Sequence, residues 1–141
     1  MHKYIEFNPI RFLKDSAKWD SEKAMLQEEL NSIVGPKGVS NTPVRSGKIG
    51  DSVGNAVLER DYIQLKINRI QTYQEALTYA WNRLTEPHRE VLRLFFFMDG
   101  YKPPLIHSYG LKYALCRSDV YKARREALAE LSHIITQKYR L

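Results

Sequence analysis

Residues 116–128 read CRSDVYKARREAL. A polar cap opens this stretch, apolar side chains recur at helical spacing, and basic side chains fill the positions between them. The pattern predicts an amphipathic helix that buries one face in a small core and turns a cationic face outward. A shorter helix is expected just before it, from Leu105 to Tyr113. Two such helices in succession are typical of a helix-turn-helix, in which the second helix lies in a DNA groove.

The sequence on either side completes a three-helix unit over residues 85–141. Thr85 is expected to cap a core helix with Pro87 in its first turn, and Asp99-Gly100 is expected to end that helix. Gly110 stands in the short helix, where some helix-turn-helix units need a small residue for close packing. The core helix is expected to bury Val91, Leu92, Leu94, Phe95 and Phe96. The last helix is expected to bury Val120, Ala127, Leu128, Leu131, Ile134 and Ile135.

Two long helices are expected upstream, over 1–34 and 51–84. Asn8 and Pro9 have the character of a cap and first turn, and Asp51 or Ser52 is expected to cap the second helix. The expected stripe of the first helix is Ile10, Leu13, Ala17, Ala24, Leu26, Leu30 and Ile33. In the second, the apolar residues Ile63, Ile70, Leu77 and Leu84 recur every seven positions, and Ile67, Tyr73 and Trp81 widen that face.

Seven-residue spacing favours long helix–helix packing. We favour the first helix as the partner within one chain, and dimerisation through a second protomer stays open. The fold class is therefore all-α, with a long helical hairpin or extension followed by the C-terminal three-helix unit. No alternating strand pattern or internal repeat is visible in the sequence.

Residues 35–50, GPKGVSNTPVRSGKIG, are expected to form a flexible basic linker, because four glycines and two prolines leave little to bury. A tether is one interpretation. A basic arm that becomes ordered on a phosphate backbone is the other.

Charge is unevenly distributed along the chain. The net charge is +6, and residues 101–141 carry eight Lys or Arg against three Asp or Glu, whereas residues 1–33 carry five against six. A basic end on a nearly neutral body suggests a polyanion partner at that end. The single cysteine excludes an internal disulfide, and no signal peptide or membrane span is visible, so a cytoplasmic location is expected.

Residues 84–135 resemble the DNA-reading region 4 of bacterial sigma factors, with matching pieces at Leu84 to Met98, Asp99-Gly100, Leu105 to Tyr113 and Arg117 to Leu131. Residues 45–135 are more similar to phage and prophage late-gene transcription activators of the RinA and ArpU type. The strings that carry this likeness are Cys116 to Lys122, Arg124 to Leu128, and Gly50 to Val57.

The chain departs from that family at Cys116, where a serine is usual, and at Pro103-Pro104 and Tyr109-Gly110, which replace a Thr-x-x-Glu-Ile-Ala run. The resemblance implies a sequence-specific activator of phage late genes that contacts RNA polymerase as well as double-stranded DNA.

The DNA-binding residues are expected near the start of the last helix, on the face opposite its apolar stripe. Basic side chains there can donate to guanine or to phosphates, and hydroxyls can donate to phosphates. Asp119 either accepts from cytosine or caps the helix. The candidates are Arg117, Ser118, Asp119, Tyr121, Lys122 and Arg125. Lys102, His107 and Lys112 of the preceding helix are expected to contact the DNA phosphate backbone.

We expect no enzymatic activity, catalytic residue, metal site or cofactor. The four histidines are scattered, and no phosphate-binding loop or nucleophile elbow is present. Two other functions compete with the activator: a phage small terminase subunit, which would form rings and start DNA packaging, and a helical protein–protein adaptor, which would not bind DNA.

Overall fold

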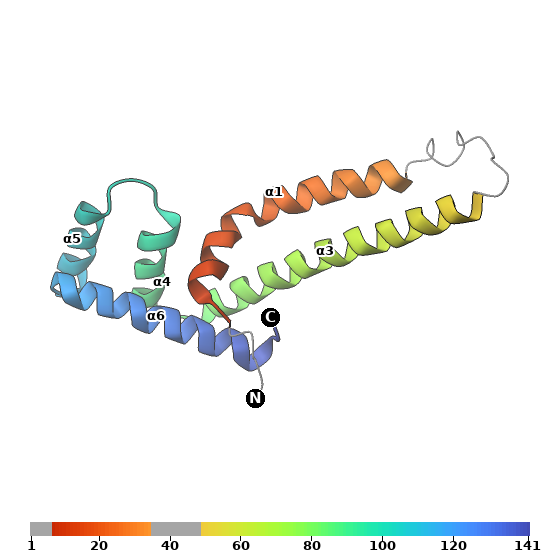
Figure 1. Ribbon diagram of the computed structural model, residues 1–141. Coiled ribbons are helices and arrows are strands. Elements are labelled where there is room, and N and C mark those ends of the chain that lie inside the picture. Colours follow the sequence, from red (N-terminus) through yellow and green to blue (C-terminus); the bar gives the residue numbers. More distant parts are fainter. Residues whose placement is uncertain (1–6, 35–48) are drawn as a thin grey trace, which may run out of the picture. The chain divides into compact units, whose positions relative to one another are not determined.

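The computed structural model describes residues 7–34 and 49–141, with side chains for 7–33 and 57–141. The helices are α1 (Pro9–Val34), α3 (Ile49–Arg83), α4 (Glu86–Leu92), the π-helix η1 (Arg93–Phe97), α5 (Lys102–Tyr113) and α6 (Arg117–Lys138) (Figure 1). The described ranges contain no strand, so the expected all-α class is confirmed. None of the helices in these ranges combines the length and the apolarity that a membrane crossing requires.

The chain divides into two compact units. One unit combines Met1–Ala17, described from Phe7 onward, with Glu75–Leu141, and the other is Lys18–Gln74. Both α1 and α3 contribute to each unit, because the division falls within these two helices.

In the second unit, α1 and α3 pack along an apolar seam. Leu30 of α1 lies in a buried cluster with Ile63 and Ile67 of α3, and Leu26 and Ile33 pack against that cluster. The two helices run side by side in opposite directions there (Figure 1). Of the apolar face that was expected on α3, Ile63 and Ile67 are therefore covered by α1 in this unit.

The same two helices also meet through polar and aromatic side chains. The Gln74 amide of α3 donates to Asp20 Oδ1 and accepts from Lys23 Nζ, each at 2.8 Å. The rings of Trp19 and Tyr73 lie 5.8 Å apart between centroids. These contacts fix the register of α1 against α3 within this unit.

The start of α1 agrees with the sequence, whereas its buried face agrees only in part. Asn8 Oδ1 accepts the Arg11 backbone N–H at 3.1 Å, which confirms the predicted cap. Leu13 and Leu30 are buried and Leu26 and Ile33 half-buried, but Ile10, Ala17 and Ala24 are exposed. Phe12 and Trp19 are buried in their place. The reason is that α1 serves two units, so its buried face is not one continuous stripe.

The start of α3 differs from the prediction. The helix begins at Ile49, so Asp51 and Ser52 lie inside it and neither caps it. A single glycine such as Gly50 costs a helix about 1 kcal/mol, which does not stop a helix of 35 residues. Residues 35–48 of the predicted linker, and with them the basic-arm alternative, lie outside the described residues.

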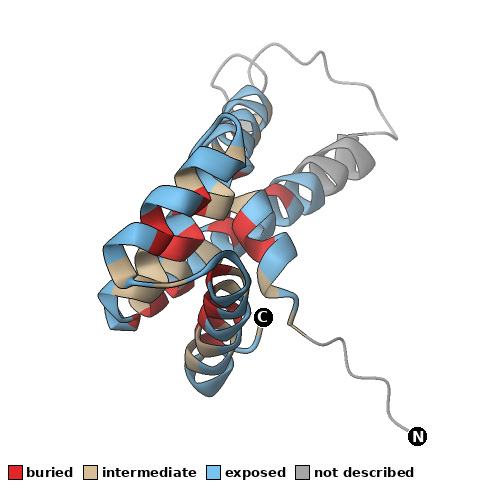
Figure 2. Cartoon of the chain, turned by 90° about the vertical axis from the view of Figure 1, so that its left-hand side faces the viewer, coloured by how far each residue is buried: buried red, intermediate tan, exposed pale blue. Residues whose placement is uncertain are grey.

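The C-terminal part of the first unit is built from α4, η1, α5 and α6. Both α4 and α5 pack on α6, and α5 also packs on η1. The largest fully buried side chains of this core are Val91, Leu92, Val120, Leu131 and Ile135. Buried and exposed positions form separate stripes along the helices in Figure 2. The predicted α6 stripe is buried throughout except at Ile134, which is half-buried.

The core helix departs from a regular α-helix after Leu92. Its backbone widens into the π-helix η1, where Leu94 is buried but Phe95 and Phe96 are only half-buried. The guanidinium of Arg124 lies 5.0 Å from the Phe95 ring centroid and 5.4 Å from that of Phe96, and thus covers both rings from α6. Thr85 occupies the N-cap position of α4, as expected, but its side-chain oxygen accepts no capping hydrogen bond from the backbone.

Candidate nucleic-acid interface

A tight turn joins α5 to α6. Ala114 adopts the left-handed conformation, with φ 57° and ψ 47°, and the Leu115 N–H then donates to the Gly110 carbonyl at 2.8 Å. This bond spans five residues and closes the end of α5 in the manner of a Schellman motif. Cys116 is extended, at φ −80° and ψ 171°, and α6 begins at the next residue.

Gly110 makes this turn possible. A Cβ at that position would lie 2.6 Å from the Leu115 carbonyl oxygen and 3.7 Å from Val120 Cγ2. The chain therefore passes so close to α5 that only glycine fits, as the sequence suggested. The contact also fixes how the first turn of α6 sits on α5, because Val120 is fully buried there.

The predicted recognition residues of α6 share the outer side of its first turns. Ser118, Lys122 and Arg125 are exposed, and so are Arg117 and Asp119 beside them. Val120, Ala127 and Leu131 are buried on the opposite side of the helix. The fold thus presents a polar and cationic face at the N-terminal end of α6.

Tyr121 is the exception, since it is half-buried. Its ring lies 5.6 Å from that of Phe95 between centroids, and the Arg117 guanidinium lies 6.0 Å from the Tyr121 centroid. Tyr121 therefore contributes a ring contact beside the cationic face and is only partly open to solvent.

A small polar cluster surrounds Cys116 at the start of α6. Cys116 is the N-cap, and its Sγ lies 3.2 Å from Ser118 Oγ and donates to Asp119 Oδ2 at 3.2 Å. The Asp119 carboxylate stands in the first turn, where the helix dipole favours negative charge. The N-cap itself is Cys116 and not Asp119, whose carboxylate accepts from the Cys116 thiol.

The two lysines expected to act from α5 are both engaged with the body of the unit. Lys102 Nζ donates to the carbonyls of Leu94, at 3.0 Å, and Met98, and so satisfies the open end of η1. Lys112 Nζ lies 2.5 Å from Glu90 Oε1 of α4. That hydrogen bond lowers the pKa of the Glu90 carboxyl and raises the pKa of the Lys112 ammonium.

Other carboxylates of this unit are also matched within it. Glu130 lies 2.5 Å from His88 Nδ1, and Glu86 forms an ion pair with Arg89 at 2.8 Å. Within residues 7–33 and 57–141, Lys122 and Arg125 form no ion pair. Their charge is consequently available to a partner outside the chain.

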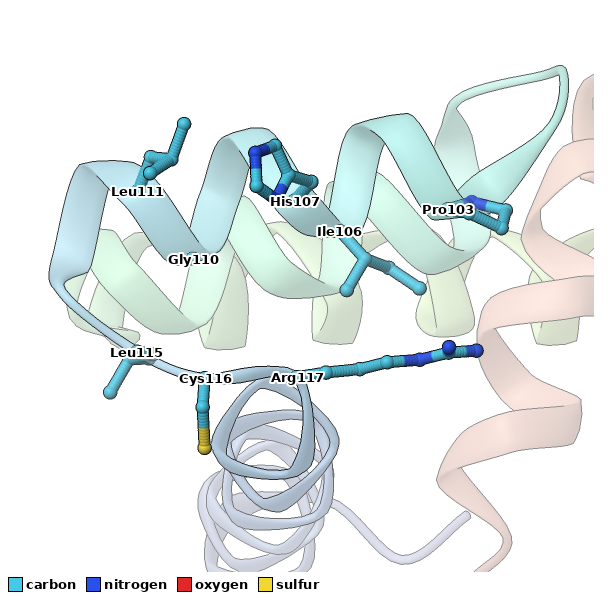
Figure 3. A pocket seen from close by; sticks show the side chains of 8 residues that line it. All are labelled: Pro103, Ile106, His107, Gly110, Leu111, Leu115, Cys116 and Arg117. Carbon is cyan, nitrogen blue, oxygen red and sulfur yellow. The ribbon is translucent and has the colours of Figure 1, made fainter.

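A hollow of about 400 Å³ lies between α5 and the start of α6. In Figure 3 the side chains of Arg117 and Cys116 leave the start of α6 in different directions beside it. No sequence signal indicated this hollow, because its walls come from both helices and the turn. It is lined by Pro103, Ile106, His107, Gly110, Leu111, Leu115, Cys116 and Arg117.

Comparison of the chain with protein-family models, with curated proteins and with solved structures found no match. Among the described residues, no three His, Cys, Asp or Glu side chains are grouped as a metal ion would require. The case for a function therefore rests on the residues of α5 and α6 and on their geometry.

Proposed function

We propose that the chain binds double-stranded DNA sequence-specifically, with α5, the turn and α6 acting as a helix-turn-helix. In this proposal α6 lies in the major groove, and its outer side chains Ser118, Lys122 and Arg125 reach base edges and phosphates. The proposal rests on Lys122 and Arg125, whose exposed cationic side chains form no ion pair with any described residue, on a helix whose other side is buried.

Three further features support it. The close contact at Gly110 fixes α6 against α5, and rigid presentation of a helix is what base reading requires. The net charge of the chain is +6, which favours a polyanionic partner. The likeness to RinA- and ArpU-type activators points to regulation of phage late genes, through a second contact with RNA polymerase.

Lys102 and Lys112 have structural contacts in the free protein, so we assign them a smaller part in phosphate binding than Lys122. Arg117 stands at the N-terminus of α6, where the helix dipole and the guanidinium both attract a phosphate. Asp119 contributes by holding the start of the helix through Cys116.

The test begins with selection of bound sequences from random duplexes, followed by affinity measurements on the preferred site. A plot of log affinity against log salt concentration has a negative slope for a DNA-binding protein. If the Lys122 side chain contacts a phosphate, Lys122→Ala should make that slope less steep by about 0.9. Arg125→Ala should cost roughly 1–3 kcal/mol against the preferred site alone if the side chain contacts a base. Lys138→Ala is the matched control, because it removes the same charge from the far end of α6 and should change neither quantity.

The proposal fails if Lys122→Ala and Arg125→Ala both leave duplex affinity unchanged in a folded protein. An absence of DNA binding at physiological salt would favour the helical adaptor instead. Ring assembly with binding to packaging sites would favour the small terminase subunit, whereas protection of a promoter by a monomer or dimer supports the activator.

A further inference from the structure

One side of α3 in the second unit carries large apolar side chains that remain open to solvent. Leu58, Tyr62 and Leu65 are 69%, 58% and 56% exposed. Their spacings of four and three residues place them in one stripe, as in the seam of packed helices. The buried Ile63 and Ile67 lie on the other side of the helix, against α1. We refer to Leu58, Tyr62 and Leu65 as the α3 stripe.

Opposite charges flank this stripe at its two ends. Glu59 and Lys66 are both exposed, and their separation of seven positions amounts to nearly two full turns, so both stand on the same flank. Lys66 Nζ lies 4.4 Å from the centroid of the Tyr62 ring at the centre of the stripe. Neither charge forms an ion pair within the described part of the chain.

We propose that the α3 stripe binds the α3 stripe of a second copy of this chain, with the two helices antiparallel. The midpoint between Glu59 and Lys66 along the axis of α3 falls between Tyr62 and Ile63. Each charged residue lies about 5 Å from that midpoint, in opposite directions along the helix. A twofold axis at that midpoint, perpendicular to both helices, keeps each flank against the same flank of the other copy. It therefore sets Glu59 of each copy opposite Lys66 of the other, twice.

The charge order selects this partner and this direction. In a parallel pair the twofold axis runs along the helices and places the Glu59–Lys66 flanks of the two copies on opposite sides of the seam, so neither charge would meet its counterpart. The self-complementary order is what an isologous contact between identical copies requires. Because the stripe is only about two turns long, the dimer is weak and depends on protein concentration.

Sedimentation equilibrium of the full chain without DNA tests this contact. The wild-type protein should show a monomer–dimer equilibrium. Leu65→Gln should raise the dimer Kd about tenfold or more, because this one substitution removes an apolar side chain from the contact in both copies. Gln71→Ala changes another exposed position of α3 outside the stripe and should leave the Kd unchanged.

Charge exchange tests the antiparallel register. Glu59→Lys and Lys66→Glu should each weaken self-association by at least about threefold. Mixing the two variants should restore association, because one copy then carries two positive and the other two negative flanking charges. The double variant should associate as the wild type does.

The proposal is overturned by a wild-type chain that stays monomeric at all concentrations, which would leave the stripe to a different protein. It is also overturned by a dimer that Leu65→Gln does not weaken, or by mixed variants that associate no better than each alone. Because these measurements contain no DNA, they leave the assignment of α6 unaffected.

Discussion

Gly110→Ala is the substitution that most directly tests the turn between α5 and α6. The new Cβ would lie 2.6 Å from the Leu115 carbonyl oxygen, whereas real Cβ contacts essentially never fall under 3.0 Å. The obstacle is backbone rather than a flexible side-chain end, so no rotamer change relieves it. Either α5 or the turn must move, and the bond from the Leu115 N–H to the Gly110 carbonyl is then stretched or lost.

Three terms set the size of the effect. Forcing a methyl group into a packed contact costs about 1–3 kcal/mol. Weakening the backbone hydrogen bond puts about 0.5–1.5 kcal/mol at risk. Replacing glycine by alanine within a helix stabilises the helix by about 1 kcal/mol, which offsets part of these losses. The net expectation is a loss of roughly 0.5–3.5 kcal/mol in the free energy of unfolding.

Urea denaturation followed by circular dichroism measures this loss. Ser108→Ala is the control, because it introduces the same side chain at an exposed position of α5 and should stay within about 0.5 kcal/mol of the wild type. Without the close contact, helix propensity alone would make Gly110→Ala more stable than the wild type. A variant that matches or exceeds wild-type stability would therefore refute the reasoning about this turn.

Three other outcomes are expected. Ala114→Gly should be neutral or stabilise the protein by up to about 1 kcal/mol in thermal unfolding, because a φ of 57° is strained for alanine but not for glycine. A clear loss of stability would contradict this. Glu90→Gln should reduce the loss of stability at acid pH. Lys112 lowers the pKa of the Glu90 carboxyl, so this group stabilises the fold above its ordinary pKa and loses that contribution as pH falls through the lowered pKa. Urea titrations that show the same acid loss in both proteins would argue against the pair. Burial raises the pKa of Tyr109 to about 12, so its contribution is present below the ordinary tyrosine pKa of about 10 and is lost as pH rises through 12. Tyr109→Phe should remove that alkaline loss, while at neutral pH it should cost about 0.5–1.5 kcal/mol through the bond to the Pro87 carbonyl; equal alkaline unfolding of both proteins would contradict it.

Features set by local sequence could be predicted. The Asn8 cap depends on its own side chain and a backbone N–H three residues away. The α6 stripe follows from the 3.6-residue helical period, so Val120 and Leu131 were assigned to the core correctly. The need for a small residue at Gly110 was also visible, although the identity of its close neighbour, the Leu115 carbonyl, was not.

Features set by partners distant in the chain could not be predicted. Lys112 resembles any exposed lysine in the sequence, and only the fold brings Glu90, 22 residues away, to it. The widening of the core helix at η1 has no signal in a run of apolar residues, because such a run is compatible with either helical geometry. Phe12 and Trp19 were missed because periodicity within α1 does not reveal that two units share it.

Cys116 is exposed and is the chain's one cysteine. A thiol-reactive fluorophore added to the wild-type protein thus attaches once per chain, one residue before α6, without any engineering of competing thiols. The label replaces the contacts of the thiol with Ser118 and Asp119, but it breaks no hydrogen bond to the helix backbone, because the N-cap side chain makes none. Energy transfer from that dye to either end of a short labelled duplex would reveal the orientation of the bound protein along its target.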